Sequence, residues 1–262
     1  MTQSIKRVVF TGGTGGLGRH VVEGLAREGA EIVVISRQRP AVGLPCVGHA
    51  SADLSEPSGI ADAAAIVKRE EPDLLVNMAG IQYFGPAELQ SFDDLQRSYM
   101  VNLIAPVALC QACLPIMKRR NCGHVVNVGS IIGSIGMANF AAYASAKAGL
   151  RVFSEALRRE VSGTSVAVTY VAPRAVRTAM LSPKIEKYAG LTGMNIDAPE
   201  DVAERILTAI RAREKEVFIG FPERLFVRLN AVLPGVVDAA VARGDRKAKD
   251  LFSETATSKT GG

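Results

Sequence analysis

The chain has 262 residues, of which 48% are hydrophobic and 22% are charged, and its net charge is +5. This length accommodates one α/β domain with its own hydrophobic core and is too short for two domains of ordinary size. The lysines and arginines are scattered, apart from small clusters at 118–120 and 243–249, so the concentrated basic face of a nucleic-acid-binding protein is missing. We therefore expect no nucleic-acid partner.

Cys110 and Cys113 are formally spaced as C-x-x-C, but the other cysteines and the three histidines offer no partner set for a metal site. Cys110 and Cys113 fall inside an apolar helical pattern, which favours small buried thiols over a zinc or redox site. We expect no bound metal. The amino terminus leads directly into a predicted strand without the features of a secretory signal, and no run long enough to cross a bilayer is expected, so a cytoplasmic location is predicted.

Strand and helix patterns alternate in chain order. We predict strands at residues 6–11, 31–36, 46–50, 73–78, 123–129, 165–171 and 215–219. We predict helices at residues 16–28, 58–70, 92–118, 141–162 and 199–212. Such alternation indicates an α/β protein with a doubly wound parallel sheet, the Rossmann fold, in a single domain over residues 1–220.

A glycine-rich turn joins the first predicted strand to the first predicted helix. Residues 11–18 read TGGTGGLG, and Gly13, Gly15 and Gly18 match the dinucleotide-binding pattern G-x-G-x-x-G. Glycines permit the tight turn and let the backbone approach a pyrophosphate, while N–H groups of the first helical turn supply hydrogen-bond donors. The strand, turn and helix together predict a dinucleotide site rather than a turn without a ligand.

The end of the second predicted strand bears on the choice of cofactor. NAD-binding proteins of this fold place an Asp or Glu there, bonded to the ribose 2′-hydroxyl. Here the strand ends in Ser36 and Arg37. A hydroxyl and a guanidinium suit the 2′-phosphate of NADP(H), which a carboxylate would repel, and Arg39 would assist. We therefore predict NADP(H); the alternative is a solvated Arg37 beside an unselective ribose pocket.

Tyr143 and Lys147 lie four residues apart in a predicted helix and therefore share one face. A nearby ammonium favours the phenolate, so Lys147 is expected to lower the pKa of Tyr143 from about 10 toward neutral pH. A tyrosine tuned in this way exchanges a proton with a substrate oxygen. Ser130 follows a buried strand, at the edge where parallel sheets bind ligands. The alternative is a half-buried Tyr beside a solvated Lys.

In their order and spacing, these motifs resemble the short-chain dehydrogenase/reductase family from about Lys6 to Ile219. The likeness rests on the glycine turn, Asp53-Leu54, Asn77-Met78-Ala79-Gly80, Asn102, Ser130, Tyr143, Lys147 and residues 173–178 (PRAVRT). Two positions depart from the family pattern. Met78 stands where the family usually has a second Asn, and Arg174 stands where it usually has Gly.

The resemblance implies a role for each matching residue. Ser130 would bind the substrate carbonyl oxygen, Tyr143 would exchange its proton, and Lys147 would hold the nicotinamide ribose. Asn102 would fix a water that relays protons to Lys147; the alternative is an amide that satisfies backbone groups within a helix. The residues implied to contact the cofactor are Gly12, Thr14, Gly16, Leu17, Gly18, Ser36, Arg37, Asp53, Leu54, Asn77, Ala79, Gly80, Tyr143, Lys147, Pro173, Val176 and Thr178.

The same resemblance implies an NADP(H)-dependent oxidoreductase that interconverts a ketone and a secondary alcohol on a small-molecule substrate. A 3-oxoacyl-carrier-protein reductase is one candidate within that class. A dinucleotide-sensing regulator without turnover is the alternative from another class. The retention of Ser130, Tyr143 and Lys147 favours the enzyme.

Residues 179–199 form a weakly periodic segment in the position of the family's substrate loop. Its apolar side chains favour an aliphatic or ring-bearing substrate. They are Met180, Leu181, Tyr188, Leu191 and Met194.

The chain continues beyond residue 220, where many members of the family end. Residues 221–242 carry an apolar stripe at helical spacing, which Pro234-Gly235 should break near Leu233. We expect an extra helix over the substrate entrance or against another subunit; a membrane-surface helix is the alternative. Residues 243–262 are expected to be a disordered tail. The stripe comprises Leu225, Phe226, Leu229, Val232, Leu233, Val236 and Val237.

Two predicted helices, 92–118 and 141–162, carry apolar residues on more than one face. Apolar surface beyond what the sheet can cover is expected to pack against another element or subunit. The family resemblance implies that these helices meet symmetry mates in a dimer or tetramer. The alternative is that neighbouring helices of the same subunit cover the surplus. The residues concerned are Val107, Leu114, Met117, Leu150, Phe153 and Leu157.

Overall fold

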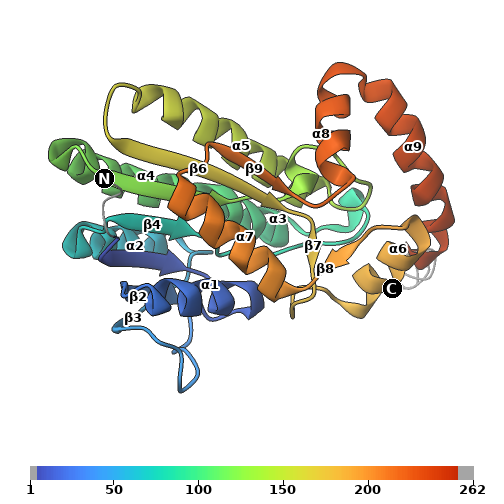
Figure 1. The fold of residues 1–262 in the computed structure, drawn as a ribbon. Helices are drawn as coiled ribbons and strands as arrows, with labels where there is room; N and C mark the ends of the chain where they lie inside the picture. The colour runs from blue at the N-terminus through green and yellow to red at the C-terminus, as the bar shows by residue number, and fades with distance from the viewer. Residues whose placement is uncertain (1–4, 253–262) are drawn as a thin grey trace.

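A computed structural model describes residues 5–252 of the chain. Seven strands form one sheet in the order β3-β2-β1-β4-β5-β6-β9, and every neighbouring pair is parallel (Figure 1). The order reverses between β1 and β4, which is where doubly wound sheets bind ligands. The predicted fold class is confirmed. The strands are β1 (Arg7–Thr11), β2 (Glu31–Ser36), β3 (Gly48–Ser51), β4 (Leu74–Asn77), β5 (Gly123–Val128), β6 (Val166–Pro173) and β9 (Glu216–Ile219).

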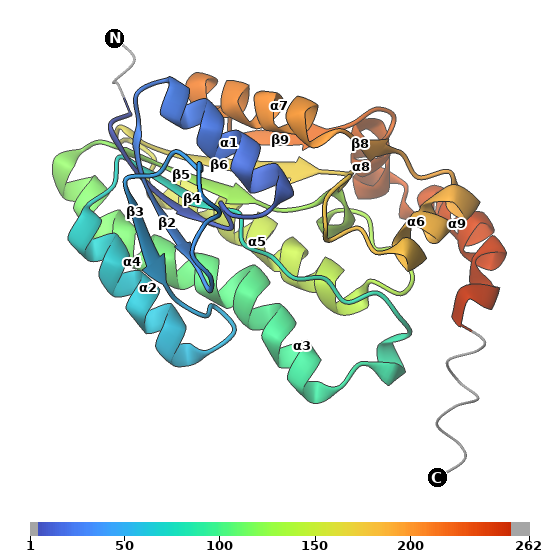
Figure 2. The ribbon, with the colours of Figure 1, turned by 90° about the horizontal axis from the view of Figure 1, so that it is seen from below.

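Helices cover both faces of the sheet (Figure 2). On one face α1 (Gly16–Arg27) packs beside α7 (Pro199–Ala212), and the other face carries α2 (Pro57–Glu70), α4 (Ala105–Arg120) and α5 (Ala141–Glu160). Alternate residues of each strand serve the two cores. In β1, for example, Val8 and Phe10 pack toward α1 and α7, and Val9 packs toward α2 and α4. Burial on both faces explains why the strands read as continuous apolar runs.

The predicted helix at 92–118 is interrupted by a wider turn. It consists of α3 (Phe92–Tyr99), a π-helical segment at Met100–Ile104 and α4. By length and composition, Phe92–Arg120 could cross a membrane, contrary to our expectation that no run is long enough. However, 67% of its most apolar window is buried inside the protein, because this helix packs in the core beside α2 and α5.

The segment predicted as a substrate loop contains regular structure. Helix α6 (Pro183–Thr192) begins after Ser182, whose hydroxyl accepts a hydrogen bond from the Ile185 N–H at 3.3 Å. The two-residue strands β7 (Ala175–Val176) and β8 (Ile196–Asp197) pair in parallel at the base of this segment. The pairing closes residues 177–195 into a unit beyond the carboxyl ends of the main strands.

The carboxyl-terminal extension is a helical hairpin, α8 (Glu223–Val232) and α9 (Pro234–Lys247), which stands out from the body of the protein (Figure 1). The predicted break at Leu233 is confirmed. The expectation of a disordered tail from residue 243 is wrong in its first part. Helix α9 continues to Lys247, and a short 3-10 helix, η4, follows at Lys249–Phe252. The remainder of that tail, 253–262, lies outside the described residues.

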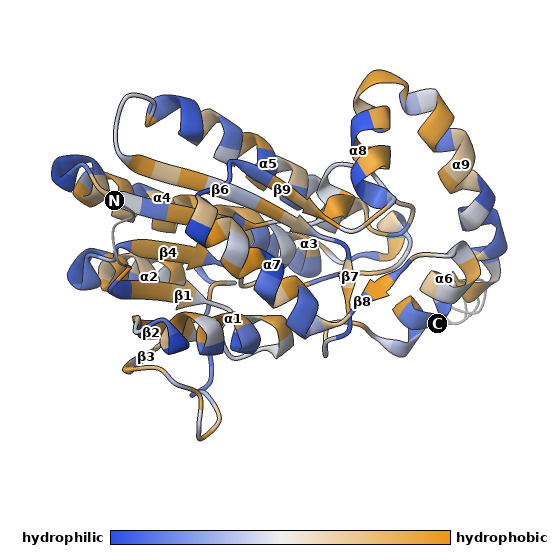
Figure 3. Ribbon diagram, in the orientation of Figure 1, coloured by the Kyte–Doolittle hydropathy of each residue, from blue (hydrophilic) through white to orange (hydrophobic). Residues whose placement is uncertain are grey.

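The apolar stripe of the extension faces mostly outward. Only Val227 of α8 and Val237 of α9 are buried within the hairpin helices, whereas the side chains near the turn are exposed, and Figure 3 shows apolar residues where α8 meets α9. The break at Leu233 folds the two helices back on each other, so a single buried stripe cannot form. The exposed members of the stripe are Leu225, Phe226, Val232, Leu233 and Val236.

Candidate active site

The glycine-rich turn lies against the carboxyl end of β4. Gly12 has a φ of +78°, and a Cβ atom there would lie 2.6 Å from the Ala79 nitrogen, so only glycine fits. The hydroxyl of Thr11 accepts hydrogen bonds from the N–H groups of Met78 (3.2 Å) and Ala79 (3.3 Å). Thr11, absent from the predicted site residues, therefore fastens the turn to β4.

Helix α1 begins directly after this turn, with Gly15 as its N-cap and no side chain capping its first N–H groups. Its amino terminus is thus open to an anionic group. A Cβ atom on Gly16 would lie 3.0 Å from Cγ2 of Thr178, which places the predicted Thr178 directly over the first turn of α1. Val176 packs against the core on the same side of the sheet.

The end of β2 places Ser36 and Arg37 at the carboxyl edge of the sheet, where the glycine-rich turn also lies. The Ser36 hydroxyl donates to the Gln38 carbonyl (2.8 Å) and contacts Nε2 of His49 (3.1 Å). The Arg37 side chain is exposed and forms no hydrogen bond or ion pair within residues 5–252. A guanidinium in this position is ready to meet an anion from solvent.

Asp53 and Leu54 follow β3, and their side chains lie in different surroundings. One oxygen of Asp53 accepts two hydrogen bonds from Ser55, from its N–H at 2.9 Å and its hydroxyl at 2.7 Å. These bonds hold the pKa of Asp53 below its usual value, with a smaller contribution from the charge of Arg37. The Leu54 side chain is buried in the core, so only its backbone can reach a ligand.

The Asn77 side chain does not face the glycine turn. It donates to Oδ1 of Asn127 at 2.9 Å, and Asn127 in turn donates to the Ser154 hydroxyl at 2.9 Å. This buried network joins β4, β5 and α5. Because side chains alternate along a strand, the Asn77 side chain points inward toward α4. The backbone of Ala79 and Gly80 follows at the carboxyl end of β4.

Ser130, Tyr143 and Lys147 converge, as the sequence predicted. The Ser130 hydroxyl lies near enough to Tyr143 to lower the pKa of its phenol, and the Lys147 ammonium lies 5.9 Å from the centre of the Tyr143 ring. Lys147 donates to the Val128 carbonyl at 3.0 Å, two residues before Ser130. All three side chains are buried, with exposed fractions of 8% for Ser130 and Tyr143 and 3% for Lys147.

The pKa values of Tyr143 and Lys147 differ from the expectation. Burial raises the pKa of Tyr143 to about 12, and the neighbouring Ser130 hydroxyl only partly opposes this rise. Burial lowers the pKa of Lys147 to about 8. The sequence pattern predicted the proximity of a cation but not the loss of solvent from both groups, which disfavours the phenolate and the ammonium alike.

Asn102 lies in the π-helical segment, within reach of the lysine. Its amide donates to the carbonyls of Ile81 (2.8 Å) and Ser98 (2.9 Å), and its oxygen accepts from the Ile81 N–H at 3.3 Å. The side chain therefore satisfies backbone groups, the alternative that the sequence left open. A Cβ atom on Gly80 would lie 3.1 Å from the Asn102 oxygen and 3.7 Å from the Lys147 nitrogen, so the three residues meet at one point.

Two further features of the site were not predicted. The Tyr170 hydroxyl of β6 donates to the Ser130 carbonyl at 3.5 Å and so supports the backbone that follows β5. An aromatic cluster lies beside Tyr143, which shares a hydrophobic core with Phe140 and Tyr188. Its rings come from positions far apart in sequence, so only the folded chain brings them together: Phe84, Phe140, Tyr188 and Phe252.

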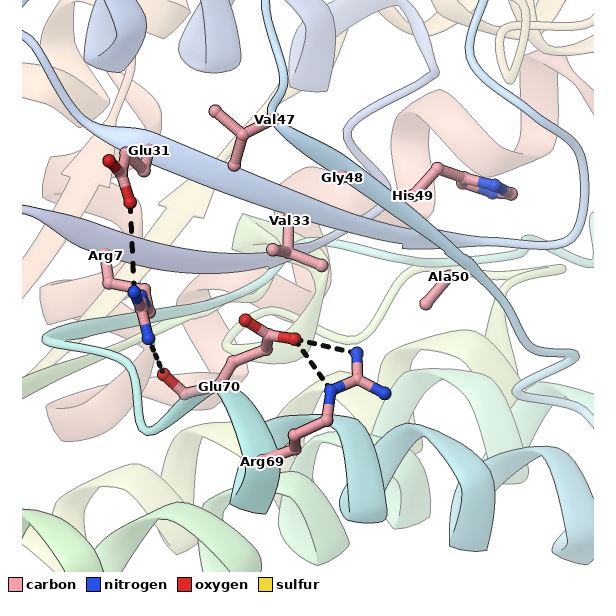
Figure 4. Close-up of a pocket in the computed structure, with 9 residues that line it drawn as sticks. All are labelled: Arg7, Glu31, Val33, Val47, Gly48, His49, Ala50, Arg69 and Glu70. Carbon is pink, nitrogen blue, oxygen red and sulfur yellow. Dashed lines mark hydrogen bonds and ion pairs between the residues drawn. The ribbon is translucent and has the colours of Figure 1, made fainter.

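A hollow of about 260 Å³ lies at the opposite end of the sheet, near the amino ends of β1 and β2 (Figure 4). Its charges pair among themselves: Arg7 lies 3.9 Å from Glu31, and Arg69 bonds Glu70 at 2.7 Å (Figure 4). The site residues lie at the other end of the strands, so this hollow is separate from them.

The cysteines behave as small core residues. Cys110 and Cys113 are buried in α4, and burial raises the pKa of Cys113 to about 12, as expected for an inert thiol. Within residues 5–252, no three His, Cys, Asp or Glu side chains gather in a way that could hold a metal ion.

Comparison with known proteins places the chain in a family. The family described as short chain dehydrogenase matches residues 6–189. The "Ketoacyl reductase HetN" of Nostoc sp. is 29% identical, over 94% of this chain and 95% of that protein. The bovine "Dehydrogenase/reductase SDR family member 7B" is 33% identical, over 92% of this chain and 83% of that protein.

The fold has close structural counterparts as well. A short-chain dehydrogenase from Burkholderia cenocepacia, solved in complex with NADP, superposes with a TM-score of 0.77 over 92% of this chain and 99% of that one, at 23% identity. At that identity the likeness concerns the fold. With the family match over residues 6–189, these findings show that the chain belongs to the short-chain dehydrogenase/reductase family of oxidoreductases.

Proposed function

We propose that the protein is an NADP(H)-dependent oxidoreductase that interconverts a ketone and a secondary alcohol. One observation carries the proposal. The neighbouring hydroxyls of Tyr143 and Ser130, with Lys147 on the same helix as Tyr143, lie at the sheet edge that also holds the glycine turn. A proton donor, an oxygen-binding group and a dinucleotide cradle are the components that this chemistry requires.

The residues fit a dinucleotide. The uncapped amino terminus of α1 and the glycine contacts at Ala79 leave a backbone cradle for the pyrophosphate. Ser36 and the exposed Arg37 would hold the 2′-phosphate, which is why we propose NADP(H) rather than NAD(H). When bound, this cofactor supplies or accepts the hydride. Lys147 would bind the nicotinamide ribose through an ammonium that now bonds the Val128 carbonyl.

The hydroxyl groups divide the remaining work. Ser130 would donate a hydrogen bond to the substrate carbonyl and stabilise the developing alkoxide. Tyr143 would give that oxygen its proton during reduction. A pKa raised to about 12 keeps the phenol protonated at neutral pH, so it can give a proton, although it is a weaker acid than the sequence pattern predicted. The burial of both groups excludes competing water from the reacting oxygen.

A 3-oxoacyl-carrier-protein reductase is the second candidate within this class, and the name of the Nostoc relative supports it. A regulator that binds a dinucleotide without turnover is the alternative from another class. The intact grouping of Ser130, Tyr143 and Lys147 supports the enzyme.

The test is a panel of carbonyl compounds with NADPH or NADH, followed by nicotinamide absorbance. We expect turnover with NADPH and a clear preference over NADH. Arg37→Glu should lower catalytic efficiency with NADPH by roughly ten- to a hundredfold, the usual value of a charge-assisted hydrogen bond, and spare NADH. Lys68→Glu, an exposed charge change on α2, is the matched control. Equal efficiency with both cofactors in the wild type would refute the NADP(H) assignment.

A further inference from the structure

Arg174, one of the two departures from the family pattern, forms an ion cluster that is largely shielded from solvent. Its guanidinium donates two hydrogen bonds to Asp197, at 2.9 and 2.6 Å, and a third to Glu223 at 2.8 Å. The three side chains are only 15–19% exposed. The φ of Arg174 lies outside the left-handed region, so this position does not require the glycine that the family usually has.

Gly220, directly after β9, makes room for the arginine. Its φ is +117°, and a Cβ atom there would lie 2.7 Å from Cδ of Arg174. The Arg174 side chain therefore crosses a backbone position that only glycine suits, and it also donates to the Phe221 carbonyl at 3.1 Å. The arginine at 174 and the glycine at 220 fit each other, so the cluster occupies a space that is shaped for it.

The cluster fixes the short strand pair β7 and β8 (Figure 1). Arg174 directly precedes β7, and Asp197 is the last residue of β8, where it pairs with Val176. The Arg177 N–H also donates to the Asp197 carbonyl at 3.0 Å. Two strands of this length are too short to hold their own position, so the charge-assisted hydrogen bonds to Asp197 add the constraint that the ladder lacks.

From β7 the chain runs directly to the proposed cofactor cradle. A Cβ atom on Gly16 would lie 3.0 Å from Cγ2 and 3.1 Å from Cβ of Thr178, so Thr178 lies against the first turn of α1. Only residues 175–177 separate Arg174 from Thr178, and Val176 among them packs against the core. The position of Thr178 at the cradle therefore depends on where the ion cluster holds the start of this segment.

The adenosine half of a dinucleotide lies out of reach of this segment. Ser36 and Arg37, which we propose for the 2′-phosphate, stand at the end of β2, whereas Arg174 follows β6. Four strand spacings separate β2 from β6 in the sheet, and neighbouring strands lie about 4.8 Å apart, so the two strand ends are about 19 Å apart. A local effect of Arg174 on cofactor binding therefore falls on the nicotinamide half.

We propose that Arg174 is a positioning residue for the nicotinamide half of the cofactor: by pairing with Asp197 it sets the path of residues 174–178 and so holds Thr178 against the first turn of α1. The inference rests on the proposed function. Arg174 acts through the backbone and makes no contact of its own with the cofactor. Without the guanidinium, the carboxylates of Asp197 and Glu223 lose their shared partner in partly buried positions, and their repulsion displaces β8 together with the residues that pair with it.

The test compares the binding of NADPH with that of 2′,5′-ADP, which carries the adenosine half and its 2′-phosphate but no nicotinamide. Arg174→Gln keeps most of the side-chain stem over Gly220 and removes the charge. By isothermal titration calorimetry, its Kd for NADPH should rise about tenfold, the affinity equivalent of one hydrogen bond, while its Kd for 2′,5′-ADP should stay unchanged. NADH and 5′-AMP form the same comparison without the 2′-phosphate, so the result does not depend on which dinucleotide the protein prefers.

Arg205→Gln is the matched control. Arg205 bonds both carboxylate oxygens of Glu214, at 2.7 and 2.8 Å, near the start of β9 and so at the opposite edge of the sheet. Loss of this ion pair should leave both Kd values unchanged. Arg174→Lys keeps the charge but not the paired geometry, and its Kd for NADPH should lie between those of the wild type and Arg174→Gln.

The route through Asp197 is tested by a double substitution. Asp197→Asn alone should also raise the Kd for NADPH and spare 2′,5′-ADP. Combined with Arg174→Gln it should add nothing to the effect of Arg174→Gln, because both changes remove the same contact. Additive losses would show that the two residues act independently and would overturn the proposed route.

The remaining outcomes separate this role from the proposed function. Wild-type affinity for NADPH in Arg174→Gln, or an equal loss for NADPH and 2′,5′-ADP, overturns the positioning role. Where Arg174→Gln does not fold, Asp197→Asn carries the comparison by itself, and equal effects on the two ligands then refute the role. If the wild type binds NADPH but reduces no ketone, the proposed function fails and the binding comparison still decides the role of Arg174. A wild type that binds no dinucleotide refutes both.

Discussion

At the scale of single residues, burial dominates the chemistry of the site. Tyr143 and Lys147 share a helix face and sit together, yet the loss of solvent shifts each pKa toward the neutral form. The lysine is 3% exposed, and among the described residues its hydrogen-bond partner is the carbonyl of Val128. A buried amine of this kind is held for function at a cost to stability.

The pH dependence of unfolding measures that cost. Between pH 8 and 10.5, the folded and ordinary pKa values of Lys147, the unfolded chain binds a proton that the folded chain does not. Stability from this group therefore rises with pH across the window, and its penalty is complete below pH 8. Lys147→Met should stabilise the cofactor-free protein by roughly 2 kcal/mol at neutral pH, after about 1 kcal/mol for the lost hydrogen bond.

Denaturant unfolding at several pH values checks this prediction. The advantage of Lys147→Met should shrink as the pH rises above 8 and should reverse before pH 10.5, because the lost hydrogen bond still costs about 1 kcal/mol there. Lys68→Met, on the exposed face of α2, should show no such trend. A stability difference that stays constant over the pH range would contradict the buried-amine account.

At the scale of elements, the sequence predicted what local patterns determine. All seven main strands lie within two residues of their predicted bounds, and the break at Leu233 follows from proline chemistry. The π-helical turn at Met100–Ile104 and the inward Asn77 could not be predicted, because tertiary packing decides them. The sequence showed that Arg174 departs from the family pattern. Its ion-pair partners, Asp197 and Glu223, are distant in sequence and come together with it only in the folded chain.

The helix surfaces show the same limit. Four of the apolar residues predicted to lie on surplus surface are instead buried by neighbouring elements of the same subunit. They are Leu114, Met117, Leu150 and Leu157. Val152 of α5 is 63% exposed and Ile104 is 45% exposed. Self-association therefore stays a prediction, and these two residues now support it.

Light scattering at micromolar concentration tests self-association. We expect a mass above the 27.8 kDa monomer, and Val152→Glu should lower it, because a charge on this face disrupts an apolar contact. Val232→Glu, at the turn of the hairpin, should keep the wild-type mass. A wild-type mass near that of the monomer would refute the claim. Membrane contact of the hairpin remains the alternative for its exposed stripe, and flotation with anionic liposomes tests it.

At the scale of the whole molecule, the parallel sheet assembles a site from distant segments. The glycine turn, Ser130 and the Tyr143 helix meet at the carboxyl edge because every main strand runs in the same direction. The extension is attached to the body of the protein by the ion pair of Arg174 with Glu223 and by the hydrogen bond from Tyr188 to Asp245.

The central claim is that the Tyr143 hydroxyl transfers the proton, and one substitution tests it. Tyr143→Phe keeps the ring in its cluster, so the affinity for NADPH should survive while kcat for ketone reduction falls by roughly two to four decades. Tyr99→Phe removes a hydroxyl that bonds Ser145 at 2.7 Å on another face of α5, and it should keep wild-type turnover. Near-full turnover in Tyr143→Phe, measured by NADPH absorbance, would contradict the account.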